Sequence, residues 1–262
     1  MVRRLRKVSP PRADGAKNSG AEQALACAAT NPEAHAQLLL HLKRHHSYET
    51  SHESTCVPPG SLLSDVLRGF YQGTNIPLGL PFSIFLTFLS GLLCKQGIKL
   101  KAPDGSVITP DIWTIVLGAS GCGKTWTIDQ LRHLFPDCGE IPLGGAVSAP
   151  AFLRILSQQS KGVWLEDEWA QYQREIEKPS SPLAPVRSIL LQIYGGATLR
   201  RERVTGEEIT VNNPCIAICG LTVDKTYREI CSIESILDGF AARFGFIFAE
   251  PDPQRPFHKY PW

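Results

Sequence analysis

Blocks of apolar residues alternate with amphipathic stretches along the chain, and this alternation predicts strands and helices in turn. Three nearly unbroken apolar runs occur at residues 112–117, 215–220 and 244–249. Runs of this kind are typical of parallel strands that are covered on both faces. Further strands are predicted at residues 162–165 and, as a short one, at 141–147. Strands that alternate with helices predict an α/β fold with a mostly parallel sheet and flanking helices.

Helical patterns fill most of the intervals between these strands. Ser148 is expected to be the N-cap of one of the helices, because its hydroxyl can accept a bond from a free backbone amide of the first turn. Helices are predicted from apolar spacing and Pro or Gly boundaries at residues 61–71, 81–94, 124–135, 149–159 and 186–194. Two hairpins are predicted, across residues 98–109 and 198–211.

One helix is apolar enough to raise the question of a membrane. Residues 82–93 are strongly apolar, and no charged residue lies between Arg68 and Lys95. A spanning helix needs about 20 apolar residues, whereas Pro77 and Pro81 limit the length of this one. We therefore expect a buried helix and no membrane contact.

The beginning of the chain differs in composition from the rest. Residues 1–30 are basic and then small and polar, which predicts a disordered tail, and residues 32–44 can form one short helix. We expect a tail and linker over residues 1–59 and one domain over residues 60–262. That domain is divided into two parts, a helical lead-in at 60–97 and a core at 98–257.

Composition and charge exclude several classes of protein. The chain has 262 residues, of which 43% are hydrophobic, so it can bury a core and is not a disordered chain. Lys and Arg number 27 and Asp and Glu 25, a net charge of +2. This balance excludes a uniformly basic nucleic-acid coat, and any contact with DNA must be local. Eight cysteines without a CxxC pair, and a first segment without an apolar signal, predict a cytoplasmic protein.

Histidines gather ahead of the main domain. His41, His45, His52 and Cys56 have a spacing that can hold zinc, but they lack a paired-thiolate motif. A solvated helix and linker is the interpretation that we favour.

The strongest motif follows the strand at residues 112–117. It matches GxxxxGK[ST], the phosphate-binding loop, and consists of Gly118, Ala119, Ser120, Gly121, Cys122, Gly123, Lys124 and Thr125. The glycines let the backbone curl so that its amides face phosphates, and the helix that follows adds its positive end. We expect Lys124 to reach the β- and γ-phosphates of ATP and the Thr125 hydroxyl to bind Mg²⁺.

An acidic cluster ends the strand predicted at residues 162–165. Asp167 is assigned to Mg²⁺, and Glu168 to polarising the attacking water as a catalytic residue. Glu166 takes the place of Glu168 if the register slips by one residue. A strand that simply ends in an acidic, solvated loop is the alternative.

Three weaker features lie nearer the carboxyl terminus. Thr222 either approaches the γ-phosphate or caps the next helix. Arg243 either completes the nucleotide site of a neighbouring subunit as a catalytic residue or forms a surface ion pair. The hairpin at residues 198–211 carries Arg200, Arg201 and Arg203, which either follow a phosphate backbone or are simply solvated.

A resemblance to one protein family rests on five segments that occur in this order: GASGCGKT, LEDE, the arginine hairpin, CIAICG and GFAARF. Over residues 60–257 the chain resembles a domain-of-unknown-function family of P-loop ATPases from bacterial plasmids, phages and integrated elements. Members accompany or are fused to primase domains and are regarded as helicase-like. The resemblance implies a RecA- or AAA-like P-loop NTPase core and a role in replication of mobile-element DNA. No primase motif precedes the loop, and the chain stops at Trp262 without a helical extension, so we expect a shortened or split form.

These features together predict an ATP-binding and ATP-hydrolysing protein that uses Mg²⁺. We expect a helicase-like motor that contacts DNA, in single-stranded form, assembles as a homo-oligomer and works with a separate primase or initiator protein. The alternative is an ATP-binding regulatory or switch module without motor activity. A small-molecule kinase is disfavoured, since no substrate lid is evident after the nucleotide-binding helix.

Overall fold

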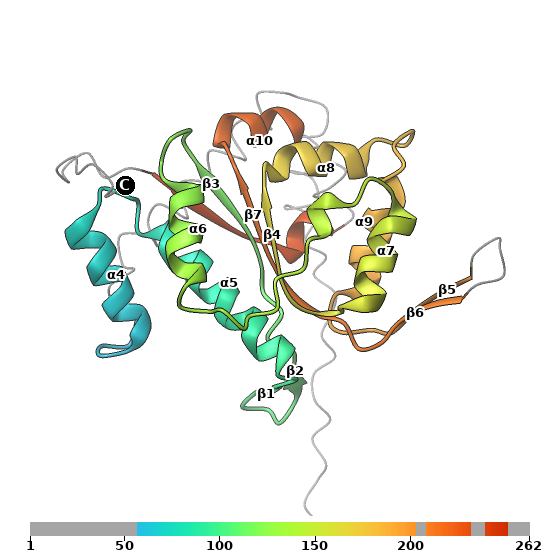
Figure 1. Cartoon of the computed structure of the whole chain (residues 1–262), viewed down its shortest axis with the longest axis horizontal. Coiled ribbons are helices and arrows are strands. Elements are labelled where there is room, and N and C mark those ends of the chain that lie inside the picture. Colours follow the sequence, from blue (N-terminus) through green and yellow to red (C-terminus); the bar gives the residue numbers. More distant parts are fainter. Residues whose placement is uncertain (1–56, 203–207, 232–238, 251–262) are drawn as a thin grey trace, which may run out of the picture.

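The computed structural model describes residues 57–202, 208–231 and 239–250, and every structural statement below concerns these ranges. Four predictions fall outside them: the disordered tail, the helix at residues 32–44, the histidine cluster, and Arg203 in the hairpin. Figure 1 shows a central sheet with helices on both sides.

The sheet has four parallel strands in the order β4-β7-β3-β8. The strands are β3 (Trp113–Gly118), β4 (Lys161–Asp167), β7 (Cys215–Thr222) and β8 (Gly245–Ala249). Every residue of β3 and β7 is buried, which explains why both read as unbroken apolar runs. The predicted α/β class with a parallel sheet is confirmed.

Helices cover both faces of this sheet and make a three-layer architecture. One face packs against α4 (Leu62–Gly73), α5 (Gly79–Lys95) and α6 (Lys124–Arg132). The other face packs against α7 (Ala149–Gln158), α8 (Trp169–Glu177), α9 (Ala184–Ile193) and α10 (Asp224–Ile230). Side chains alternate between the two faces along each strand. Val116 of β3 packs into the core on the side of α4, α5 and α6, and Ile115 and Leu117 pack into the core on the side of α7 to α10.

Helix α5 is the apolar helix, and its burial is confirmed. Leu80, Ile84 and Phe88 have no exposed surface. The helix lies so close to β4 that a Cβ on Gly91 would come within 2.7 Å of the Val163 Cβ, so glycine is needed at this crossing. None of the helices in the described part of the chain is long and apolar enough to cross a membrane.

Both predicted hairpins are present as two-stranded antiparallel ribbons. Strands β1 (Leu100–Lys101) and β2 (Val107–Ile108) form the first ribbon. Strands β5 (Leu199–Glu202) and β6 (Glu208–Val211) form the second, which extends away from the body of the molecule (Figure 1).

Three predictions about local structure were wrong or incomplete. Residues 141–147 do not form a strand: Glu140 makes one isolated bridge with Val163, and a 3-10 helix, η1 (Leu143–Gly145), follows. Pro142 has no amide hydrogen for a strand ladder, and the glycine pair after Leu143 favours a turn. Helix α6 ends at Arg132, three residues earlier than predicted, and helix α8 was not predicted.

Candidate functional site

The carboxyl ends of β3, β4 and β7 meet at one edge of the sheet, where ligands bind in open parallel sheets. The glycine loop leads from β3 to α6 at this edge. Gly121 and Gly123 have φ angles of 76° and 87°, which glycine adopts without the cost of a Cβ. A Cβ on Gly118 would lie 2.8 Å from the Cys122 sulfur, so the loop also needs glycine where it leaves the strand.

The loop presents unused donors to this edge. No hydrogen bond among the described residues engages the backbone amides of Gly121 and Gly123. Gly123 is the N-cap of α6, which places these amides at the positive end of that helix. The Lys124 ammonium donates a hydrogen bond to the Ala119 carbonyl, 3.0 Å away across the loop. The arrangement is that of an anion-binding turn.

The loop and the acidic strand are in direct contact. The Thr125 hydroxyl donates a hydrogen bond to Asp167 Oδ2 over 3.3 Å. Both residues are exposed, and Asp167 is the last residue of β4. Two oxygen ligands of the kind that Mg²⁺ binds therefore lie side by side.

Glu166 lies on the opposite face of β4 from Asp167, because successive side chains of a strand alternate. It accepts a hydrogen bond from the Trp164 indole over 3.1 Å, and its carboxyl group packs against the backbone at Gly144 in η1. Burial raises the pKa of Glu166 to about 7. Its carboxyl group therefore does not share the face on which the Thr125 hydroxyl meets Asp167.

Glu168 stands between β4 and α8 in an unusual backbone conformation. Its φ angle is 71°, and its exposed carboxylate accepts a hydrogen bond from the Gln171 amide over 3.2 Å. The next residue, Trp169, is fully buried. A Cβ on Gly220 of β7 would lie 2.5 Å from the Trp169 ring, so Trp169 anchors the turn that carries Glu168 against the sheet.

Thr222 does not cap a helix, which corrects one of its two predicted roles. It is the last residue of β7, and α10 is capped by Val223. Thr222 is 2% exposed, and its hydroxyl has no hydrogen-bond partner in the described part of the chain. In the sheet it is level with Leu117 of β3, and its neighbour Leu221 is level with Asp167 of β4. An unpartnered buried hydroxyl is costly, and this one lies between the loop strand and the acidic strand.

A pocket of about 480 Å³ opens beside the loop. It is bounded by Gly118, Ala119 and Ser120, by the first residues of α10 and by the end of β8. Three charged residues in its wall were not predicted as site residues: Asp224, Lys225 and Glu250. The signal was available, because Asp224 and Glu250 closely follow the apolar runs that form β7 and β8.

Arg243 is not brought to this edge. It lies in the short 3-10 helix η2 (Ala241–Arg243) just before β8, and therefore at the opposite, amino-terminal edge of the parallel sheet. Its guanidinium donates a hydrogen bond to the Gly239 carbonyl and stacks on the Tyr194 ring, 5.3 Å from the ring centre. A role for Arg243 at the nucleotide site of another subunit stays a prediction.

The β5–β6 ribbon, which carries Arg200 and Arg201, also lies away from the loop (Figure 1). Arg200 is exposed, and Arg201 donates a hydrogen bond to the Ser188 hydroxyl of α9 over 3.2 Å. One side of the ribbon is thereby fixed to the body, and Arg200 points to solvent.

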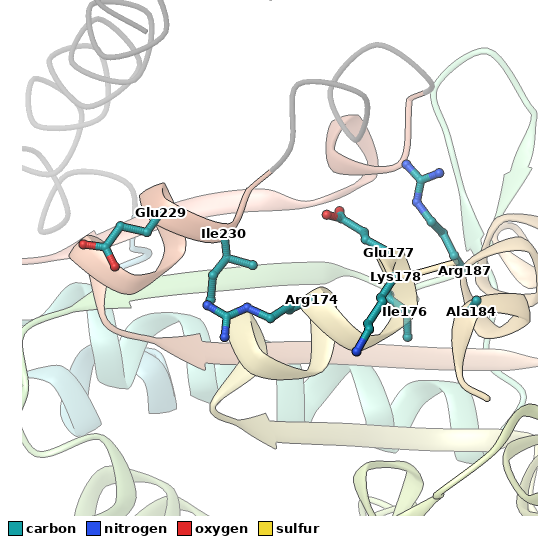
Figure 2. A pocket seen from close by; sticks show the side chains of 8 residues that line it. All are labelled: Arg174, Ile176, Glu177, Lys178, Ala184, Arg187, Glu229 and Ile230. Carbon is teal, nitrogen blue, oxygen red and sulfur yellow. The ribbon is translucent and has the colours of Figure 1, made fainter. Parts of the chain in front are cut away.

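A second pocket, of about 530 Å³, lies between α8, α9 and α10. Figure 2 shows both basic and acidic side chains around it: Arg174, Lys178 and Arg187 are basic, and Glu177 and Glu229 are acidic. None of the residues predicted for the site lines it. Comparison of the sequence with models of protein families and with curated proteins gave no match.

Proposed function

We propose that the chain binds ATP together with Mg²⁺ and hydrolyses it, as a P-loop NTPase of RecA- or AAA-like type. The observation that carries this proposal is the hydrogen bond between Thr125 of the glycine loop and Asp167 at the end of β4. It joins two motifs that are 42 positions apart in sequence, and it joins the two residues that a phosphate loop needs for its metal.

The loop fits a polyphosphate. The amides of Gly121 and Gly123 and the positive end of α6 attract the phosphate oxygens. The Lys124 ammonium, which rests on the Ala119 carbonyl, has to move only within the loop to meet the β- and γ-phosphates. The pocket of about 480 Å³ beside the loop leaves room for the remainder of the nucleotide.

The metal ligands fit Mg²⁺ by their chemistry, since a hydroxyl and a carboxylate are both hard oxygen ligands. Thr125 and Asp167 would hold the ion, which when bound neutralises charge on the phosphates. The buried Thr222 hydroxyl, unpartnered within the described residues, supports a ligand at the same edge.

Hydrolysis requires a base that orients water. Glu168 is the residue that we assign, since its carboxylate is exposed beside Asp167 and accepts a hydrogen bond from the Gln171 side chain. The Thr222 hydroxyl can donate to a phosphate oxygen of the substrate and thereby help to orient it.

The test is ATP binding and turnover of Lys124→Ala. Removal of the cation from the phosphates is expected to abolish both. Lys101→Ala, at an exposed position on β1 in a separate sheet, is the matched control and keeps wild-type values. Wild-type affinity and turnover in Lys124→Ala would overturn the proposal.

For the biological role we propose a helicase-like motor in replication of mobile-element DNA. The ribbon with Arg200 and Arg201 supports a contact with single-stranded DNA, and Arg243 supports a homo-oligomer with sites shared between subunits. A primase or initiator protein is the expected partner. The alternative is a nucleotide-dependent switch, which the near-neutral charge supports. ATP turnover with and without single-stranded DNA distinguishes the two, because only the motor is stimulated.

A further inference from the structure

Two cysteines meet at the amino-terminal edge of the sheet, on the side opposite the glycine loop. Cys94 lies in the last turn of α5, and Cys215 is the first residue of β7. Cys94 has no exposed surface and Cys215 is 7% exposed. The two side chains are close enough to shift each other's titration, and both line one small cavity. A disulfide forms between cysteines whose Cβ atoms can approach to about 3.5–4.5 Å.

A small cavity connects this pair with charged groups. It has a volume of about 100 Å³ and is lined by both cysteines and by Lys99 and Lys161. A water molecule needs only about 10–15 Å³ of such space, so the cavity is large enough for a molecule the size of hydrogen peroxide. Lys161 is level with Cys215 in the sheet, which brings its ammonium close to the sulfur.

The surroundings give the two sulfur atoms different roles. Cys215 is the more accessible of the two sulfur atoms, and Lys161 is beside it in the sheet. The interaction with Cys94, together with Lys161 and Lys99, lowers the pKa of Cys215, whereas the interaction with Cys215 and burial raise the pKa of Cys94. The thiolate is the reactive form of cysteine, so we assign Cys215 as the nucleophile and Cys94 as the thiol that follows. Cys219, four residues along β7, is fully buried and has its pKa raised to about 11.

We propose that Cys94 and Cys215 form a site of reversible oxidation by hydroperoxides, which ends in a disulfide between α5 and β7. The Cys215 sulfur attacks one peroxide oxygen, the O–O bond breaks, and the leaving hydroxide takes a proton to become water. The product is a sulfenic acid on Cys215. The Cys94 sulfur then attacks the Cys215 sulfur, the S–O bond breaks, and the hydroxyl leaves with the Cys94 proton as a second water. Two thiols are oxidised by two electrons and one peroxide is reduced; a dithiol reverses the reaction.

The proposal does not depend on ATP. Its residues lie at the other edge of the sheet, and no residue of the glycine loop lines the cavity. The disulfide would connect the end of the buried helix α5 covalently to the start of the central strand β7.

The test treats the full chain with hydrogen peroxide, alkylates the remaining thiols, and maps the digested protein by mass spectrometry without reduction. The expected result is a peptide pair joined through Cys94 and Cys215, which dithiothreitol separates. In Cys94→Ser the joined pair is lost, and a sulfenic acid on Cys215 is trapped by dimedone. Cys219→Ser, a change on the same strand, keeps the joined pair.

The result in the wild-type chain decides the proposal even if a variant fails to fold. Alkylation of both Cys94 and Cys215 after peroxide treatment would overturn it. A disulfide from either residue to another cysteine, such as Cys138, would overturn it as well.

Discussion

The Thr125 hydroxyl and the Asp167 carboxylate are hydrogen-bonded to each other at 3.3 Å. Thr125 lies in the first turn of α6, which the loop connects to β3, and Asp167 ends β4; strands β3 and β4 are not neighbours in the sheet. Strand β7 lies between them. The contact is therefore made above the end of β7, over Leu221 and Thr222, by side chains that project from the carboxyl edge. A metal ion that binds one of these two oxygen atoms therefore lies within reach of the other.

Asp167→Asn is expected to weaken the dependence on Mg²⁺. An amide has no charge to offer the metal, so the Mg²⁺ concentration for half-maximal ATP turnover should rise roughly tenfold or more. A titration of turnover with Mg²⁺ measures this. Asp129→Asn, at an exposed position on α6 that pairs with Arg132, is the control and should leave the titration unchanged.

Glu168→Gln is expected to bind ATP as the wild type does and to lose hydrolysis. The amide cannot accept a proton from water, and a loss of at least about a hundredfold in turnover is expected for a general base. Nucleotide affinity and single-turnover hydrolysis are the measurements. Glu166→Gln is the control, since its carboxyl group lies on the other face of β4 against Gly144. If Glu166→Gln loses hydrolysis and Glu168→Gln retains it, the assigned register is wrong.

Mixing two inactive variants tests the shared site. Arg243→Ala is expected to bind ATP normally and to hydrolyse it slowly, because a neighbour loses a cation for the transferred phosphate. A mixture with Glu168→Gln protein should regain activity, since one interface can then combine an intact Glu168 with an intact Arg243. Turnover against the mixing ratio is the measurement. A monomer by light scattering, with no gain on mixing, would contradict the prediction.

Neutralising the ribbon is expected to remove stimulation by DNA. With Arg200, Arg201 and Arg203 all changed to Ala, basal turnover should persist while stimulation by single-stranded DNA falls. Stimulation of the wild type should also fall as salt rises, because each phosphate contact releases counterions. Arg68→Ala, at an exposed position on α4 on the other side of the sheet, is the control. Equal stimulation of all three proteins would contradict a DNA contact at the ribbon, and absence of stimulation in all three would favour the switch.

Gly220→Ala is expected to destabilise the fold and impair the site at once. The added methyl group would meet the Trp169 ring at 2.5 Å, and overpacking of this kind costs about 1–3 kcal/mol. Displacement of Trp169 also moves Glu168, so turnover should fall more than nucleotide affinity. Urea denaturation and turnover are the measurements. Gly245→Ala on β8 is the control, since its nearest neighbour would be 3.8 Å away.

The sequence predicted the parts of the site better than their arrangement. Apolar runs mark β3 and β7 because both strands are buried on both faces, and the glycine loop is defined by its own backbone requirements. The order of the strands depends on pairing between distant segments, which no local pattern contains. The strand order places Thr222 between the glycine loop and the acidic cluster. The sequence alone left its two roles, near the γ-phosphate or as a helix cap, equally open.

Elements with mixed patterns were the ones missed. Helix α8 has few apolar residues, and its buried face includes a polar one, Gln173, which accepts a hydrogen bond from the Trp169 indole over 2.9 Å. Trp169, Tyr172 and Ile176 on this face nevertheless follow helical spacing, so the sequence did contain the signal for this helix. The segment at residues 141–147 was apolar enough for a strand, but Pro142 and the glycine pair prevented one.

The position of β7 between β3 and β4 also determines when the site can form during synthesis on the ribosome. Strands β3 and β4 each hydrogen-bond to β7 and not to each other. A nascent chain that has emerged only as far as Asn213 thus contains both the glycine loop and the acidic cluster, but it lacks the strand that holds them at their native separation. Assembly must wait for a late segment to insert between two early ones, a non-local step of the kind that slows folding.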